Sequence, residues 1–242
     1  MEVYLEAVLV IVISVLMSVL SYHLGLLTYY GACVSVLTGS VVGVFGSIWW
    51  FTLLMLFTVA GFAATRVGFF RKKAAGLQEG KKGERTHMNV LGVGIAPCII
   101  AVLHYVLSDD YSDITAIGFI ASIAVAAADT IASEIGVKDK NVILCTTLKR
   151  VPPGTDGGIS LFGTLTALFG SLFVSLLGWA VIFGEFDILI VIPVIAGLAG
   201  CFADSFLGAT LETKKVISKY TNNASTGLMG ALLAMAVAWF FL

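Results

Sequence analysis

The sequence has few charged residues, and its cysteines and histidines are few and scattered. Charged residues make up 12% of the 242 residues, whereas hydrophobic residues make up 59%, and the mean hydropathy is +1.01. Because soluble domains contain about 25% charged residues, this composition argues against a water-soluble fold. The cysteines form no CxxC pair and the histidines have no ligand spacing, which argues against a disulfide scaffold and a zinc site. The composition therefore predicts a polytopic membrane protein.

Eight apolar runs approach the roughly 20 residues that a helix needs to cross a bilayer. The second run, 26–45, is diluted by glycines and hydroxyl side chains, so seven spans are the alternative. The predicted fold class is an all-α polytopic membrane protein of about eight transmembrane helices, which form a single transmembrane domain over residues 1–242. The predicted spans are 4–21, 26–45, 48–65, 88–107, 114–137, 159–183, 188–210 and 224–242.

All 14 Lys and Arg residues fall into three loops, at 66–87, 138–150 and 214–219. Eight spans place these loops on one side of the membrane, and an excess of basic residues marks the cytoplasmic side. The opposite loops, 108–113 and 184–187, contain acidic residues and no base. We therefore expect an integral protein of a prokaryotic plasma membrane, with its active site and its basic loops facing the cytoplasm. Eight spans place both termini outside, whereas seven spans place the N-terminus inside.

The second half of the chain contains an internal repeat of a descending helix, a basic loop and a returning helix. Ala-Asp-Thr at 128–130 matches Ala-Asp-Ser at 203–205, and a glutamate follows each copy. Both copies have the same orientation, so units 114–183 and 188–242 are predicted to form a parallel repeat of helix pairs.

Two aspartates lie inside apolar runs, where a carboxylate is costly and usually functional. At the helical rise, Asp129 lies roughly 22 Å from the outer end of its helix and Asp204 roughly 24 Å from the outer end of its own. Both are therefore expected at the same depth, near the cytoplasmic side. Glu134 and Glu212 follow them and lie still closer to the basic loops.

Four carboxylates at similar depth would repel one another unless they were protonated, paired with Lys or Arg, or bound to a cation. Oxygen ligands without Cys or His favour Mg²⁺ over zinc. Asp129 and Glu134 are separated by about 140° around an ideal helix, so they converge only if the helix unwinds near Ser133, or else one of them is not a ligand. The residues alone therefore favour a cation held by some of these four carboxylates, with Asp129 and Asp204 as the functional pair.

The segment 152–160 is a glycine-rich turn, in which two prolines precede three glycines. Converging backbone N–H groups and the N-terminus of the helix that follows can bind a phosphate. Simpler interpretations stay open, because loop bases often only set topology or contact anionic lipids, and Asn222 and Asn223 could cap the last helix. The residues alone predict a phosphate site at this turn, with Arg150 just before it.

Three long motifs resemble those of a known family. They are Ala-Asp-Thr-Ile-Ala-Ser-Glu-Ile-Gly at 128–136, Pro-Pro-Gly-Thr-Asp-Gly-Gly-Ile-Ser-Leu-Phe-Gly-Thr at 152–164 and Asp-Ser-Phe-Leu-Gly-Ala-Thr-Leu-Glu at 204–212. They resemble motifs of the "domain of unknown function 92" membrane proteins, whose best-understood class is the plant phytyl-phosphate kinases. The chain departs from the family pattern at Asp156, where Ser or Asn is expected, and at Glu212, where Gln is common.

The resemblance implies a membrane-embedded kinase that transfers a phosphate from a nucleoside triphosphate, with CTP favoured, to an isoprenoid monophosphate such as phytyl or geranylgeranyl phosphate. It implies Mg²⁺ as the cofactor, and nucleotide, isoprenoid lipid monophosphate and membrane lipids as partners, with no nucleic acid. With this chemistry, Asp129, Glu134 and Asp204 are predicted to be catalytic, and these three residues and Glu212 are predicted to bind the metal. The predicted phosphate- and nucleotide-binding residues are Arg71, Lys72, Asn89, Arg150, Gly154, Thr155, Asp156, Gly157, Gly158, Ser160, Ser205, Asn222 and Asn223. Two alternatives are kept open. One is a CTP-dependent nucleotidyltransferase that makes a CDP-lipid, and the other is a cation-coupled transporter with Asp129 and Asp204 in the ion path.

Overall fold

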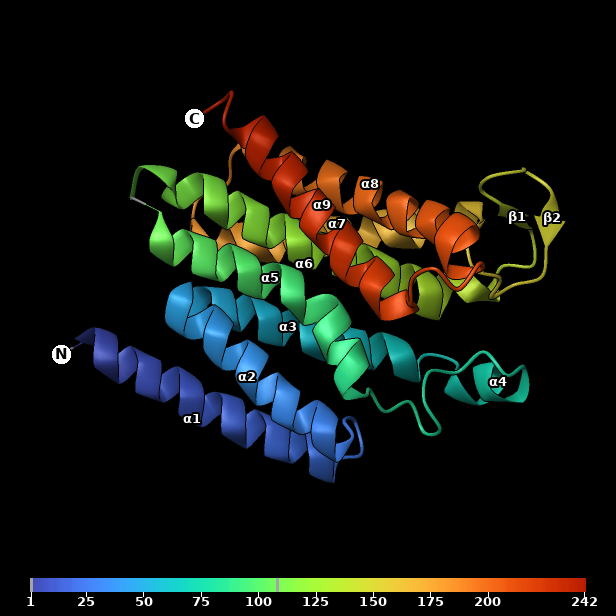
Figure 1. Ribbon diagram of the computed structural model, residues 1–242, viewed down its shortest axis with the longest axis horizontal. Helices are drawn as coiled ribbons and strands as arrows, with labels where there is room; N and C mark the ends of the chain where they lie inside the picture. The colour runs from blue at the N-terminus through green and yellow to red at the C-terminus, as the bar shows by residue number, and fades with distance from the viewer. Residues whose placement is uncertain (1, 108) are drawn as a thin grey trace.

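The computed structural model describes residues 2–107 and 109–242, and its regular structure is almost wholly helical. Within these residues, eight long helices run side by side in a bundle (Figure 1). The arrangement confirms the predicted all-α polytopic class. The long helices are α1 (Glu2–His23), α2 (Tyr29–Phe45), α3 (Ile48–Arg66), α5 (His87–Val106), α6 (Ser112–Ile135), α7 (Leu161–Ile182), α8 (Val191–Leu207) and α9 (Lys219–Ala238).

Six of the described helices are long and apolar enough to cross a membrane. Helix α2 has only 17 residues, and α9 begins with polar side chains, so these two fall short of that standard. Helix α9 begins at Lys219 rather than at the predicted residue 224, because the Ser218 side chain caps it. Asn222 and Asn223 therefore lie inside α9, and the interpretation that they cap this helix is wrong.

Helix α6 lies at the centre of the bundle. It packs against α3, α5, α7, α8 and α9, whereas α1 lies at the periphery and packs mainly on α2. All α6 residues from Ile114 to Ala128 are buried, so the helix meets protein on every side. A glycine allows one of these close contacts, because a Cβ at Gly170 of α7 would lie 2.8 Å from the backbone oxygen of Ala127.

Short elements occupy the loops at one end of the bundle. Helix α4 (Phe69–Ala74) lies in the first basic loop. In the second, β1 (Val142–Leu144), β2 (Arg150–Val151) and β3 (Gly158–Ile159) form an antiparallel sheet in the order β2-β1-β3. The predicted span 159–183 therefore begins too early, because Ile159 belongs to β3 and α7 starts after it.

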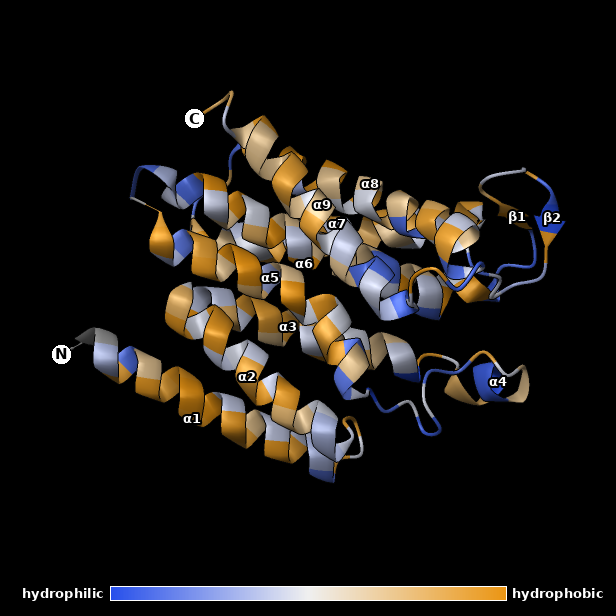
Figure 2. Ribbon diagram, viewed as in Figure 1, coloured by the Kyte–Doolittle hydropathy of each residue, from blue (hydrophilic) through white to orange (hydrophobic). Residues whose placement is uncertain are grey.

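The basic loops lie together, as the eight-span arrangement requires. Helix α1 begins and α9 ends at the end of the bundle opposite α4 and the β-strands (Figure 1). Hydrophobic residues dominate the long helices, and hydrophilic residues concentrate in these loops (Figure 2). Helices α6 and α8 both run toward the loop end, and α7 and α9 return. The parallel repeat and the cytoplasmic orientation of this end stay predictions.

Candidate active site

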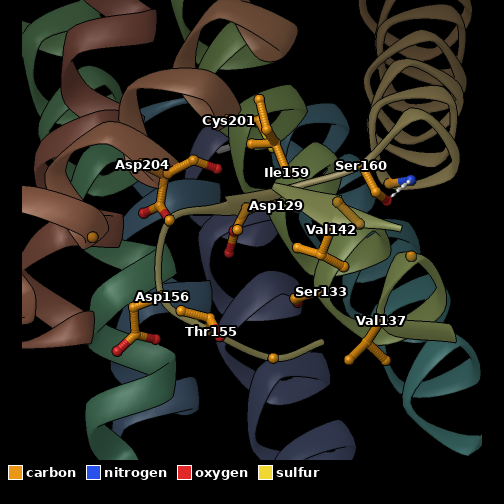
Figure 3. Close-up of a pocket in the computed structure, with 18 of the residues that line it drawn as sticks. Asp129, Ser133, Val137, Val142, Thr155, Asp156, Ile159, Ser160, Cys201 and Asp204 are labelled. Carbon is orange, nitrogen blue, oxygen red and sulfur yellow. Dashed lines mark hydrogen bonds between the residues drawn. The ribbon is translucent and has the colours of Figure 1, made fainter. Parts of the chain in front are cut away.

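An acid-lined cavity of about 380 Å³ lies at the loop end, where α6, α8 and the glycine-rich turn meet. Figure 3 shows Asp129 and Asp204 near each other on two helices, with Thr155 and Asp156 of the turn beside them. Among the described residues, six carboxylates and one lysine, Lys219, are the charged groups that line it. The predicted site residues that this cavity brings together are Asp129, Glu134, Gly154, Thr155, Asp156, Gly157, Gly158, Ser160, Asp204, Ser205 and Glu212.

The first turns of α9 hold the acidic end of α8. The Asn222 Nδ2 donates hydrogen bonds to the backbone oxygen of Asp204 at 3.0 Å and to Glu212 Oε2 at 3.4 Å. With its amide nitrogen facing Asp204, Asn223 donates to Asp204 Oδ1 at 3.3 Å. Residues Gly208–Glu212 form a π-helical turn, a distortion that is frequent at functional sites. The two asparagines therefore position Asp204 and Glu212, a role that the sequence did not indicate.

Glu134 lines the cavity, but its carboxylate is bound by other residues. Its Oε1 accepts hydrogen bonds from Arg85 and Thr65, each at 2.9 Å, and its Oε2 pairs with Lys72. The exposed fractions of Glu134 and Lys72 are 5% and 4%. We call these four residues the Glu134 cluster. It fastens α4 and the first basic loop to α6, and it places Lys72, a predicted phosphate ligand, inside the protein.

The predicted metal site of four carboxylates is not formed as a set. Within residues 2–107 and 109–242, no group of three or more His, Cys, Asp or Glu side chains could hold an ion. The reason is that α6 stays helical as far as Ile135, so Asp129 and Glu134 diverge. Asp129 and Asp204 remain as two carboxylates that line one cavity. Because Mg²⁺ is usually held by one or two carboxylates plus substrate phosphates, this pair fits a magnesium ion that binds together with a triphosphate.

Three charged residues of the site were missed by sequence reasoning: Glu79, Arg85 and Lys219. Glu79 Oε2 lies 3.1 Å from Lys219 Nζ and 3.6 Å from Arg85. Burial raises the pKa of Glu79, but Lys219 and Arg85 outweigh burial and hold the pKa below its ordinary value of 4.5. A signal for Lys219 was present in the sequence, because it precedes Asn222 and Asn223 by three and four residues, which places all three on one helix face.

The glycine-rich turn packs against the end of α8. Gly157 has a φ of +77°, and a Cβ there would lie 2.4 Å from Ala209 Cβ and 2.7 Å from the backbone oxygen of Ser205. Only glycine therefore fits this close approach. Ser160 caps α7 by accepting a hydrogen bond from the Gly163 backbone N–H at 3.0 Å. The turn and the beginning of α7 thus form one wall of the cavity.

Two predicted phosphate ligands lie away from the cavity. Arg71 of α4 and Arg150 of β2 are exposed at the loop end and do not line it. Their positions suit the simpler interpretation that loop bases set topology or contact anionic lipids.

Asn89 and Asn223 line a second cavity of about 270 Å³, which lies among α1, α2, α3 and α5. Twelve Leu, Met, Phe and Val side chains line it, together with eight Ser and Thr side chains. It shares Asp129, Ser133 and Lys219 with the acid-lined cavity. The two cavities therefore meet beside Asp129.

The fold and the site define an all-α integral membrane protein with a carboxylate-lined cavity at one end of its bundle. Residues 12–239 match the family described as "Integral membrane protein DUF92". The chain belongs to this family, which confirms the resemblance seen in its motifs. No solved structure matches the chain.

The chain is similar to several curated proteins. It is 33% identical to an uncharacterized membrane protein of Methanocaldococcus jannaschii, over 76% of this chain and 74% of that protein. It is 34% identical to "Protein VTE6, chloroplastic" of Arabidopsis thaliana, over 78% of this chain but only 57% of that protein. It is 31% identical to an uncharacterized membrane protein of Synechocystis sp., over 77% of this chain and 73% of that protein.

Proposed function

We propose that the protein is a membrane-embedded phosphotransferase. It transfers the terminal phosphate of a nucleoside triphosphate, with CTP as the favoured donor, to an isoprenoid monophosphate such as phytyl or geranylgeranyl phosphate, and so makes the diphosphate. The observation that supports this proposal is the pair Asp129 and Asp204, which enter one cavity walled by the glycine-rich turn. The family resemblance of the motifs favours the same chemistry.

Phosphoryl transfer depends mainly on positioning and on charge neutralisation. Asp129 and Asp204 would hold Mg²⁺, which neutralises charge on the triphosphate when it is bound. The glycine-rich turn and the N-terminus of α7 offer backbone N–H groups and a helix dipole to the donor phosphates, and Lys219 adds a positive charge. The acceptor phosphate is itself the nucleophile and is already ionised, so the site needs no general base.

The charge of the cavity favours a nucleotide that arrives with its cation. Six carboxylates and one lysine are the charged lining groups in the described part of the chain. A free triphosphate would meet a like charge there, which is unfavourable in a partly desolvated site. A magnesium–nucleotide complex reduces this repulsion and gives Asp129 and Asp204 a partner.

A product assay on detergent-purified protein tests the proposal. Phytyl and geranylgeranyl phosphate are each incubated with CTP, ATP, UTP or GTP, with and without Mg²⁺. Prenyl diphosphate and nucleoside diphosphate in equal amounts would support it. Pyrophosphate with a CDP-linked lipid would instead show a nucleotidyltransferase, and the absence of any product would overturn the proposal and favour the transporter alternative.

Variants of the two aspartates connect the activity to this cavity. Asp129→Asn and Asp204→Asn are each expected to lower turnover by at least about 100-fold, because each removes charge stabilisation from the transition state. Asp113→Asn is the matched control, since this exposed aspartate lies in the first turn of α6, at the other end of the helix. Wild-type turnover in either site variant would exclude the proposed metal role.

A further inference from the structure

The second cavity has the form of a binding site for a hydrocarbon chain. Its walls come mainly from α1, α2, α3 and α5, and they combine twelve Leu, Met, Phe and Val side chains with eight Ser and Thr side chains. Along α3 the lining residues run from Phe62 to Leu54, which is about 12 Å at the helical rise. The cavity therefore extends from the loop end into the apolar part of the bundle.

One end of this cavity is polar and basic. Arg85, Lys219 and Asp129 are its charged lining residues within the ranges that the structure describes, and Asn89 and Asn223 add amide groups. Arg85 also pairs with Glu134 and Glu79, and Lys219 pairs with Glu79, so an anion at this end would share both bases with these carboxylates. The acid-lined cavity has the opposite balance, with six acids and one base among the described residues. The two cavities thus differ in the balance of acidic and basic residues that line them.

The charged end of the second cavity coincides with the junction of the two cavities. Asp129, Ser133 and Lys219 line both. An anionic headgroup at this end therefore lies beside the site where the donor triphosphate is proposed to bind, while an attached chain extends away from it among α1, α2, α3 and α5.

We propose that the second cavity binds the acceptor lipid, a single-chain lipid monophosphate, with its phosphate at Arg85 and Lys219 and its hydrocarbon chain in the apolar part. The phosphate matches the basic end, and the chain matches the apolar walls. The direction of phosphate transfer rests on the proposed function, but the binding of the lipid does not. Binding without turnover can therefore test this inference separately.

Two threonines of α3 provide a matched pair of variants. Thr58 lines the second cavity and Thr52 lines neither cavity. Both side chains are partly buried, and each donates a hydrogen bond of 2.8 Å to the backbone oxygen four residues earlier. Thr58→Phe fills the cavity, whereas Thr52→Phe makes the same chemical change outside it.

Binding is measured in nanodiscs without nucleotide or Mg²⁺, by competition against radiolabelled geranylgeranyl phosphate. Unlabelled isopentenyl, geranyl and geranylgeranyl phosphates are the competitors. Thr58→Phe should weaken geranylgeranyl phosphate binding by about tenfold or more, because the chain loses buried apolar contact, and should change isopentenyl phosphate binding by less than about twofold. Thr52→Phe should bind all three like the wild type.

A headgroup variant completes the test. Lys219→Gln should weaken the binding of all three prenyl phosphates by a similar factor, because it removes a positive charge at the phosphate position that they share. Phosphatidic acid, which offers the same phosphate on two chains, should compete at least about tenfold less well than geranylgeranyl phosphate, because the cavity is assigned to one chain. Equal competition by phosphatidic acid would overturn the assignment to a single-chain lipid.

The inference is overturned if Thr58→Phe and Thr52→Phe bind geranylgeranyl phosphate equally well. If Thr58→Phe does not fold, Gly61→Leu replaces it, because Gly61 also lines the cavity and a Cβ there meets only Thr130 Cγ2, at 3.7 Å. Chain-dependent binding without any nucleoside diphosphate product would leave this inference standing and refute the proposed kinase.

Discussion

Replacing Glu134 with Gln removes the negative charge of the Glu134 cluster and keeps the size of the side chain. In the native protein the carboxylate is bound by Lys72, Arg85 and Thr65. After the change, Arg85 still has Glu79 at 3.6 Å. Lys72 stays buried, and its remaining acceptors are the backbone oxygens of Thr65 at 2.9 Å and of residue 134 at 3.4 Å. Most of the cost therefore falls on Lys72.

Removing one partner of a buried ion pair destabilises a protein by about 3–5 kcal/mol. In a domain of 150–250 residues each kcal/mol lowers the melting temperature by 2–4 °C, so the expected drop for Glu134→Gln is roughly 6–20 °C. Lys72→Met should cost less, about 1–3 kcal/mol, because Glu134 keeps Arg85 and Thr65. The double variant should be more stable than Glu134→Gln alone, because it leaves no unpaired lysine buried.

Thermal unfolding in detergent, followed by circular dichroism, measures these differences. Glu185→Gln is the matched control, since this exposed glutamate lies in the loop before α8, and its melting temperature should equal that of the wild type. The reasoning is refuted if Glu134→Gln has the same melting temperature as the control. It is also refuted if the double variant loses the full sum of the two single-variant free energies.

The same variants separate a structural role for Glu134 from the metal role predicted by the sequence. A double variant that is stable and active would assign Glu134 to holding α4 and the first basic loop on α6. A double variant that is stable but inactive would favour contact of Glu134 or Lys72 with the reacting groups, and an active Lys72→Met single variant would assign that contact to Glu134.

Three further predictions concern the glycine-rich turn, Glu79 and α9. Gly157→Ala should lower the free energy of unfolding by at least about 3 kcal/mol and abolish turnover. Gly184→Ala should lower it by only about 1 kcal/mol. Both glycines have positive φ, but a Cβ at Gly184 would meet nothing within 4 Å. The pKa of Glu79 in the folded protein lies below its ordinary value of 4.5. The stability that ionised Glu79 adds to the folded protein is therefore complete above pH 4.5, and it is lost as the pH falls through the folded-state pKa. The melting temperatures of wild type and Glu79→Gln should therefore differ at neutral pH and converge in acid. Asn222→Ala should cost about 1–3 kcal/mol in thermal unfolding, and Asn141→Ala, at an exposed loop position, under about 0.5 kcal/mol.

The sequence was sufficient to predict features that depend on local rules. A helix has a fixed rise, so counting from the outer ends gave Asp129 and Asp204 nearly equal depths, and the structure places both in one cavity. The glycine-rich turn was recognised from its composition, and it lies beside them. The all-α class followed from the apolar runs, which depend only on composition and length.

The partners of Glu134 could not be predicted in this way. Lys72 and Arg85 are 62 and 49 residues away in the chain, and the contacts depend on how the first basic loop folds back onto α6. The beginning of α9 was also predicted too late from hydropathy, because polar residues such as Lys219 and Asn222 do not extend an apolar run. The same polar residues are the ones that complete the site. The strands of the second basic loop, at two or three residues each, were too short to show a period.

The distribution of charge between the two cavities gives the proposed reaction its geometry. A lipid phosphate and a nucleotide triphosphate are both anions, and they repel each other unless the protein supplies opposite charge at each. In the proposed reaction, the acid-lined cavity would accept a triphosphate together with a cation, and the end of the second cavity that holds Arg85 and Lys219 would accept the lipid phosphate. Because the cavities share Asp129, Ser133 and Lys219, the two phosphates can approach each other at this junction. The proposed transfer is therefore confined to the junction, with the lipid chain held on one side and the nucleotide on the other.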